Sequence, residues 1–413
     1  MIDALKIALE LDQKDSLALV KDKFELPPNT VYLDGNSLGP MLKSIKAAVI
    51  DVVQEQWGNG LITSWNQHHW IDLPTTVGEK IANLLGAAPG QVVCTDSVSV
   101  NLFKLLGCAL KLNPERSIVL TETSNFPTDV YIADGFKTFL PEQKCQLQLS
   151  DSAELLNSLN ADIAVLLLTQ VDFRSGKLHD IAKITAAAQH FGIIVIWDLA
   201  HSAGAVPLQL DAWNVDFAVG CCYKYLNGGP GAPAFIYAAK RHHSNIQQPL
   251  RGWMGHKAPF DFDLDYSPSP DVRQFLCGTP PIVSMHVLNT ALDVFQGIKV
   301  EEIRAKAMAL SSFFEDLIAQ SELLREMQLI SPNDPKQRGN QLAYRHPNAY
   351  AICQALIAEN VIADFRSPDL LRFGFSALFL SFTDIAKAAQ TLHRLFETKS
   401  YLEPRFSKRQ RVT

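Results

Sequence analysis

Continuous apolar runs that end on a polar residue recur through the first half of the chain. The run over residues 193–197 stops at Asp198. An earlier run, over residues 163–168, stops at Thr169 in the same way. A run that is apolar at every position is typical of a strand buried on both faces of a parallel sheet. Because amphipathic stretches such as 181–191 separate these runs, the pattern predicts an α/β fold with a mainly parallel sheet and helical crossovers.

The pattern changes after about residue 300. It reads as helix, strand (QLAYR), helix, strand (LLRFGFS) and a final helix, which predicts a small α+β domain. We therefore expect an N-terminal helical segment over 1–30 that packs with the small domain, a large domain over 31–298, and the small domain over 299–413. Arg372 alternates with the apolar residues of LLRFGF, so it is either a surface arginine or a clamp for a carboxylate.

The segment after residue 30 predicts a short strand, a glycine-containing turn and a helix over 41–57. Asn36 or Ser37 is placed to cap that helix; alternatively, the turn approaches a ligand. Residues 58–74 follow as a predicted loop that is rich in aromatic and histidine residues, among them Trp65. A binding wall, a subunit interface or ordinary loop packing would each explain these aromatics.

Composition narrows the class of protein. The 413 residues include 47% hydrophobic and 19% charged positions and carry a net charge of −6, so we expect no nucleic-acid partner. No apolar run approaches the length of a transmembrane helix, so we expect no membrane partner. The seven cysteines form no C-x-x-C pair and no signal peptide is evident, which favours reduced thiols in a cytoplasmic protein. The histidines at 68–69 and 242–243 are adjacent pairs, so no metal site is expected.

The stretch 192–237 brings two reactive groups to strand ends. Asp198 follows one apolar run, and Lys224 comes shortly after a second, over residues 217–220. Open α/β sheets bind their ligands at the carboxyl ends of their strands. One interpretation is a structural ion pair between Asp198 and Lys224. The other is the pyridoxal-phosphate arrangement, in which the lysine forms a Schiff base and the aspartate pairs with the protonated pyridine nitrogen.

Further candidates lie where strands turn into helices. Ser97 or Ser99 either caps a helix or forms a phosphate site together with the amides of that helix. Phe126 precedes Pro127 and is therefore held extended, which would let its ring cover a flat ligand. Asp129 lies in the first turn of the next helix, where it would favour the helix dipole in any case.

A combination of short motifs resembles the kynureninases, a family of fold-type-I pyridoxal-phosphate enzymes in the class V aminotransferase-like superfamily. The motifs are DLAHSAG, CCYKYLNGGPGAPAF, YLDGNSLGP, SVSVNL, NFPTD, RGWMGH, GTPPI and LLRFGF, and they span nearly the whole chain. DLAHSAG is shared by related enzymes, whereas its combination with NFPTD, RGWMGH and GTPPI is specific. The resemblance implies a large domain with a mainly parallel, seven-stranded-type sheet plus a small C-terminal α+β domain.

The resemblance also implies residue roles. Lys224 would be the Schiff-base lysine, Asp198 the pyridinium partner, and Tyr223 an acid–base group. The implied cofactor-binding residues are Val98, Ser99, Phe126, Pro127, Thr128, Asp129, Thr169, Asp198, His201, Tyr223, Lys224, Trp253 and Thr279. The implied substrate-binding residues are Arg372, Asn36, Trp65, Trp253 and Thr279. Trp253 and Thr279 would act in the neighbouring subunit, which implies a homodimer. Some relatives have Asn where GTPPI has Thr279, a mild departure.

The implied reaction is hydrolysis of L-kynurenine to anthranilate and L-alanine by cleavage of the Cβ–Cγ bond, in tryptophan catabolism. 3-Hydroxy-L-kynurenine is the alternative substrate. The rival within the fold is a cysteine desulfurase or selenocysteine lyase, which needs a nucleophilic cysteine on a loop near the site. Cys277 is placed for that role, but its surroundings are apolar. A rival of another class is a non-catalytic protein that binds pyridoxal phosphate.

Overall fold

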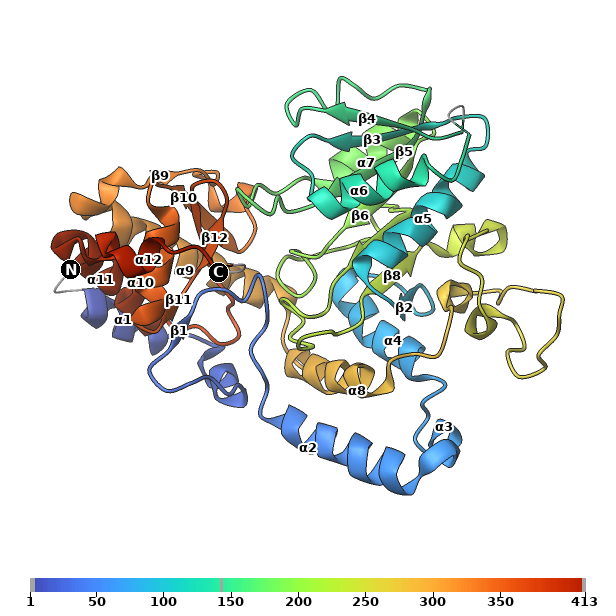
Figure 1. Ribbon diagram of the computed structural model, residues 1–413, viewed down its shortest axis with the longest axis horizontal. Helices are drawn as coiled ribbons and strands as arrows, with labels where there is room; N and C mark the ends of the chain where they lie inside the picture. Colours follow the sequence, from blue (N-terminus) through green and yellow to red (C-terminus); the bar gives the residue numbers. More distant parts are fainter. Residues whose placement is uncertain (1–3, 142–143, 411–413) are drawn as a thin grey trace.

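The computed structural model describes residues 4–141 and 144–410. Figure 1 shows two bodies side by side, the larger built on a wide sheet and the smaller formed mainly by the C-terminal part of the chain. The ends of the predicted ranges, residues 1–3 and 411–413, lie outside the described residues. The division at residues 30/31 and 298/299 stays a prediction.

The large sheet has seven strands in the order β2-β8-β7-β6-β5-β3-β4. Its strands are β2 (Val92–Cys94), β3 (Ile118–Glu122), β4 (Gln146–Ser150), β5 (Ile163–Thr169), β6 (Ile194–Asp198), β7 (Phe217–Gly220) and β8 (Phe235–Ala238). All neighbouring pairs are parallel except the two that involve β8. The predicted α/β architecture with a mainly parallel seven-stranded sheet is confirmed.

The helices of the large domain cover both faces of this sheet. They are α4 (Leu73–Leu85), α5 (Val98–Leu112), α6 (Pro127–Phe136), α7 (Ile181–His190) and α8 (Ile282–Ala291). Val165 and Leu167 of β5 point into a core with α5 and α6, whereas Leu166 and Leu168 point into the core on the opposite face. Successive residues of a strand face opposite sides of the sheet, which explains why every position in the run had to be apolar.

The small domain contains a four-stranded antiparallel sheet in the order β12-β13-β10-β9. Its elements are α9 (Val300–Ala319), β9 (Gln328–Leu329), β10 (Gln341–Arg345), α10 (Ala349–Ala358), β11 (Val361–Ile362), β12 (Asp364–Arg366), β13 (Leu370–Gly374), α11 (Phe382–Thr398) and α12 (Pro404–Ser407). The five elements predicted after residue 300 correspond to α9, β10, α10, β13 and α11, whereas the short elements β9, β11, β12 and α12 were not predicted.

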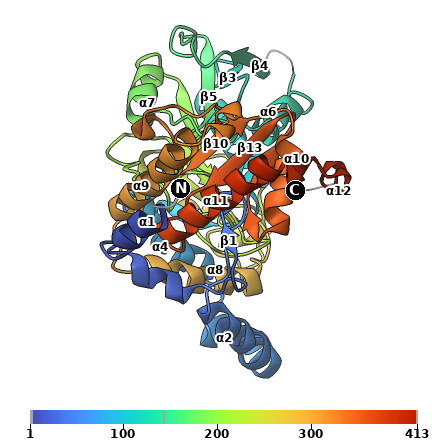
Figure 2. The same cartoon turned by 90° about the vertical axis from the view of Figure 1, so that its left-hand side faces the viewer.

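The N-terminal segment lies against the small domain (Figure 2). The side chain of Asp12, the last residue of α1 (Ala4–Asp12), accepts hydrogen bonds from the amides of Phe382 and Thr383 at the start of α11, at 2.7 and 3.0 Å. Strand β1 (Val31–Tyr32) pairs in parallel with β11. The beginning of the predicted large-domain range is therefore joined to the small domain by strand pairing.

The predictions for residues 36–74 need correction. Helix α2 (Ser44–Ile50) begins three residues later than expected, after Lys43, so neither Asn36 nor Ser37 caps it. The helix continues in π geometry over Asp51–Asn59. Helix α2 itself packs against α8, and the far end of this rod projects from the body (Figures 1 and 2).

The predicted loop over 58–74 is wrong in part, because it contains the helical turn Leu61–Thr63, α3 (Ser64–Gln67) and the start of α4. Hydrogen bonds to the buried residue Gln56 explain why this segment is helical. The side chain of Gln56 accepts a hydrogen bond from the Trp70 indole at 2.7 Å, and its carbonyl accepts one from the Ser64 hydroxyl. In the part of the chain that the structure describes, no helix has the length and apolar character to cross a membrane.

Candidate active site

A cavity of about 340 Å³ opens at the carboxyl ends of the large-domain strands. Its wall is lined by Ser97, Val98, Ser99, Phe126, Thr128, Asp129, Thr169, Phe173, Asp198, Ala200, His201, Cys221, Tyr223, Lys224, Ala232 and Ala234. Ten of the residues singled out by the sequence motifs are in this set, from Val98 to Lys224. Segments far apart in the sequence therefore meet around one pocket.

Lys224 is held by a tight turn after β7. The amide of Gly39, from the N-terminal turn, donates a 2.7 Å hydrogen bond to the carbonyl of Tyr223. A Cβ atom at position 39 would come within 2.4 Å of both the Lys224 carbonyl oxygen and Oδ1 of Asn227. Real Cβ atoms do not approach other atoms so closely, so this position requires glycine. The N-terminal turn thus packs directly against the lysine.

The amino group of Lys224 lies 3.0 Å from Nε2 of His201. Burial, followed by the charges of Lys224 and Arg372, lowers the pKa of His201 well below its usual range. The imidazole is therefore neutral and accepts a hydrogen bond from the amine. Nδ1 of His201 is buried and has no hydrogen-bond partner among the described residues.

Asp198 and Asp129 form a buried pair of carboxyl groups across the cavity floor, 3% and 0% exposed. The backbone amide of Ala200 donates to Asp198 Oδ1 at 2.8 Å. Burial, and then the charge of Asp198, raises the pKa of Asp129 well above its usual range; burial likewise raises the pKa of Asp198. Oδ1 of Asp129 is buried and lacks a partner within 4–141 and 144–410. Two such groups favour a cation beside them.

Asn125 is a positioning residue that the sequence reading did not single out. Its Oδ1 accepts hydrogen bonds from the Thr169 hydroxyl and from the Phe126 amide, the latter at 2.9 Å. Thr169 also donates to Asp129, at 3.2 Å. The backbone of Phe126 is extended, as predicted, and its ring meets Phe173 edge-on at 5.1 Å between centroids. The signal for Asn125 was present as the first letter of NFPTD.

The start of α5 faces the same cavity. Ser97 is the N-cap, and its side chain accepts a hydrogen bond from the Val100 amide at 3.4 Å. Val98 and Ser99 are the next two residues, and both line the cavity. The capping interpretation thus holds for Ser97, while the Ser99 hydroxyl remains beside the helix amides. Such a helix start is suited to bind an anion.

Tyr223 lies between the lysine and the cavity wall, with its ring centroid 5.8 Å from the Lys224 amine. Burial, and then the neighbouring Cys221 thiol, raises the pKa of the Tyr223 phenol. The phenol is therefore protonated near neutral pH and is able to donate a proton or a hydrogen bond.

Arg372 is not a surface arginine: it is 1% exposed. It lies next to the cavity without lining it, and its Nη1 donates to the carbonyl of Phe173, which does line it. Its Nη2 donates to the Ser37 hydroxyl at 3.1 Å and to the carboxylate of Asp364. Asn36 is fully buried beside this group and donates to Gln341 at 3.3 Å.

Four other residues implied by the motifs lie outside the cavity lining of this chain. Pro127 is the first residue of α6. Trp65 packs edge-on against Trp70 in α3. Trp253 lines a separate hollow with Arg251 and Tyr266, and Thr279 follows on the loop before α8. The roles implied for them stay predictions.

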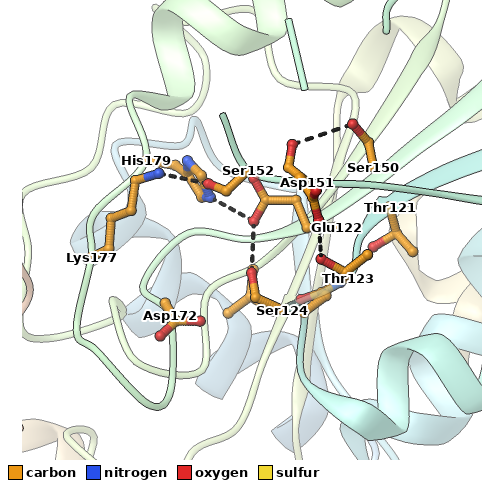
Figure 3. Close-up of polar contacts among 12 residues, drawn as sticks. Thr121, Glu122, Thr123, Ser124, Ser150, Asp151, Ser152, Asp172, Lys177 and His179 are labelled. Carbon is orange, nitrogen blue, oxygen red and sulfur yellow. Dashed lines mark hydrogen bonds and ion pairs between the residues drawn. The ribbon is translucent and has the colours of Figure 1, made fainter. Parts of the chain in front are cut away.

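A second polar cluster, also at strand ends, lies beyond the wall formed by residues 172–174 (Figure 3). The carboxylate of Glu122, at the end of β3, lies 3.0 Å from Nε2 of His179, and both side chains are buried. Lys177 donates to the Ser152 hydroxyl at 2.6 Å. Burial alone would raise the pKa of Glu122, but the hydrogen bond and charge of His179 hold it below its usual value. This network ties β3 and β4 to the 172–179 segment.

Known proteins that resemble this chain belong to the family that the residues of the cavity indicate. The model of the kynureninase C-terminal domain matches residues 303–392. The kynureninases of Burkholderia pseudomallei (strain 1106a) and Pseudomonas fluorescens are each 43% identical over 410 residues, covering 98% of this chain and 99% and 98% of theirs.

Solved structures show the fold. A C-DES variant with glycine covalently linked to its PLP cofactor has a TM-score of 0.78 at 17% identity, covering 90% of this chain and 98% of its own. A cysteine desulfurase from Thermococcus onnurineus NA1 has a TM-score of 0.76 at 17% identity, covering 92% and 98%. These likenesses confirm the fold-type-I architecture, and identity over the full length with curated relatives confirms the family: the chain belongs to the kynureninases.

Proposed function

We propose that this chain hydrolyses L-kynurenine to anthranilate and L-alanine, with pyridoxal phosphate held as a Schiff base on Lys224. The observation that carries the proposal is the cavity in which Lys224, His201 and the buried Asp198–Asp129 pair converge, in a chain that is 43% identical to curated kynureninases.

The residues present fit the cofactor. Burial raises the pKa of both carboxyl groups although the charge of Lys224 acts on each, and a protonated pyridine nitrogen beside Asp198 would supply a further cation. Val98 and Ser99 at the start of α5 would hold the phosphate. The ring of Phe126 is 37% exposed although it points into the cavity, so it would cover the flat face of the cofactor. When bound, pyridoxal phosphate supplies an electron sink for the carbanion formed at the substrate α carbon.

The chain's own groups then move protons. Lys224 would be the base that removes the α proton and later returns a proton to the α carbon of L-alanine. Asp198 would hold a proton on the ring nitrogen of the bound cofactor, because its carboxylate would be stabilised by that contact. A water molecule supplies OH to the γ carbonyl carbon, the Cβ–Cγ bond breaks, and a proton returned to Cβ gives the methyl group of L-alanine. Tyr223, with its raised pKa, is the proposed donor of that proton.

We also propose that the working form is a homodimer. Trp253 and Thr279 do not line the cavity of their own chain, which fits a role in the site of a partner subunit. The projecting rod and the turn after it expose apolar side chains that a second subunit would cover: Ile50, Val53, Trp57, Leu61 and Ile62. A cytoplasmic location remains part of this proposal, since all seven cysteines are free thiols and six are buried.

A desulfurase activity is less well supported. Cys277 is not in the cavity lining, and its thiol donates to the carbonyl of Leu250 at 2.8 Å. Burial raises the pKa of Cys277, whereas an attacking cysteine needs a lowered one. A non-catalytic binding role would be favoured by the loss of Lys224 or Asp198, and both are present in the cavity.

The test is to add L-kynurenine to the purified protein loaded with pyridoxal phosphate and to follow anthranilate fluorescence and L-alanine together. Equal amounts of both products are expected. Cofactor binding without anthranilate, or release of sulfide from L-cysteine at a comparable rate, would contradict the proposal.

A further inference from the structure

The guanidinium of Arg372 is fixed from three directions by groups on separate elements. Its Nη1 donates to the Phe173 carbonyl, and its Nη2 donates to the Ser37 hydroxyl at 3.1 Å and to the Asp364 carboxylate. Ser37 belongs to the N-terminal turn, Phe173 to the cavity wall, and Asp364 to the small domain. A buried arginine held in this way has little rotational freedom.

Strand register fixes Asp364 opposite Arg372. The two are direct partners in the antiparallel pair of β12 and β13, so their side chains lie on the same face of the sheet. Both are almost fully buried, at 3% and 1% exposed. The same carboxylate lies 3.0 Å from Nε of Arg366, whose side chain is 40% exposed. The position of the Asp364 carboxylate is therefore fixed by the pairing of β12 with β13.

Among the guanidinium nitrogens of Arg372, Nε differs from the two Nη atoms, each of which donates a hydrogen bond. Its Nε–H is buried and has no hydrogen-bond partner in the part of the chain that the structure describes. Hydrogen bonds from a guanidinium N–H to a carboxylate are charge-assisted and strong, so a single Nε–H is enough to bind one carboxylate oxygen. An unsatisfied buried donor next to the cavity wall points to a ligand that supplies the acceptor.

We propose that Asp364 is a positioning residue that turns Arg372 so that its unpartnered Nε–H faces the α-carboxylate of the substrate. The inference rests on the proposed function, because it names the groups that recognise an amino-acid carboxylate at that site. Ser37 is the second support for the guanidinium. Without Asp364 the guanidinium keeps its charge but loses the orientation that aims its Nε–H at the carboxylate.

The experiment compares two ligands of the holoenzyme that differ only in the carboxylate. L-Alanine and L-alaninamide are titrated against the wild type and Asp364→Asn, with binding followed by calorimetry. We expect Asp364→Asn to bind L-alanine roughly 10- to 100-fold more weakly, the cost of one misaligned charge-assisted contact, and to bind L-alaninamide within about twofold of the wild type. In turnover of L-kynurenine, KM should rise more than kcat falls.

Glu315→Gln is the matched control, since it removes the carboxylate partner of Arg338, another buried arginine of the small domain. It is expected to lower the melting temperature without changing the preference for L-alanine. Ser37→Ala removes a support from a different element and should weaken L-alanine binding alone, by a smaller factor, even where Asp364→Asn folds poorly.

Two results would overturn the inference. One is equal weakening of both ligands in Asp364→Asn and Ser37→Ala, which would mark the cluster as structural only. The other is wild-type protein that binds L-alaninamide as tightly as L-alanine, which would place carboxylate recognition elsewhere. Neither result touches the formation of anthranilate by the wild type, which decides the proposed function independently.

Discussion

Nε2 of His201 lies 3.0 Å from the amino nitrogen of Lys224, and the imidazole is the neutral partner of that contact. The two residues come from different loops, one after β6 and one after β7, at the carboxyl edge of the sheet. The amine is thus oriented before any ligand binds. A group held in place in this way loses less entropy when it reacts.

Replacing the lysine tests its role as the base. Lys224→Ala should lower turnover of L-kynurenine by at least roughly 10²- to 10⁴-fold, the usual contribution of a positioned acid–base group. The melting temperature is measured in parallel, because the amine also contacts the buried His201 and its loss changes the stability of the fold. Turnover is measured from anthranilate fluorescence. A variant that keeps more than about a tenth of the activity would exclude Lys224 as the base.

The paired carboxyl groups predict a pH effect on the protein after the cofactor is removed. The pKa of Asp129 is raised in the folded state, so the stability linked to this group is present below its unfolded pKa, about 3.9, and is lost as pH rises toward the folded value. The melting temperature of the cofactor-free protein should fall over the interval that begins near the unfolded pKa, about pH 4, and extends upward. Asp129→Asn should fall less steeply over that interval. If the melting temperatures of the wild type and Asp129→Asn fell in parallel with pH, the raised pKa of Asp129 would be contradicted.

The Glu122–His179 contact (Figure 3) predicts the opposite pH dependence, in which stability is lost as pH falls. Because the pKa of Glu122 is lowered, its contribution to stability is present above the unfolded pKa, about 4.3, and is lost as pH falls. Glu122→Gln should cost roughly 1–3 kcal/mol of unfolding free energy near neutral pH, and less in acid. Urea denaturation at several pH values measures this. Glu115→Gln, at an exposed position, is the control and should be nearly neutral.

Two glycines form a matched pair for the turn that supports Lys224. Gly39→Ala forces atoms 2.4 Å apart against the Lys224 carbonyl, so it should destabilise the fold by about 1–3 kcal/mol and weaken cofactor binding. Gly135→Ala, in α6, meets no atom within 4 Å and should be neutral or stabilising by up to about 1 kcal/mol. Equal effects of the two substitutions would mean that the contact at Gly39 is easily relieved.

The strand ends could be predicted because a buried parallel strand needs apolar residues at every position. The polar residue that stops each run, such as Asp198 or Thr169, therefore marks the ligand edge of the sheet. The NFPTD and SVSVNL motifs follow predicted strands, so they placed Phe126 and Ser99 at the same edge of the sheet. The role of Asn125 could not be predicted, because its side chain accepts a hydrogen bond from Thr169, a residue that is distant in the sequence.

The surroundings of Arg372 could not be predicted from local pattern. Its partner Asp364 is found through the register of two short strands, and register depends on tertiary packing. Ser37 was expected to cap a helix, yet that helix begins at Ser44 and the hydroxyl faces Arg372 instead. The order in residues 58–74 likewise depends on Gln56, a polar side chain that the fold buries.

The most direct measurement of the central claim is to locate the cofactor. The protein loaded with pyridoxal phosphate is reduced with borohydride, digested, and its peptides are weighed by mass spectrometry. We expect the phosphopyridoxyl group on the peptide that contains Lys224, and less of it when the protein first meets L-kynurenine. Label on another lysine, such as the buried Lys104, with Lys224 unmodified, would contradict the assignment of this cavity as the active site.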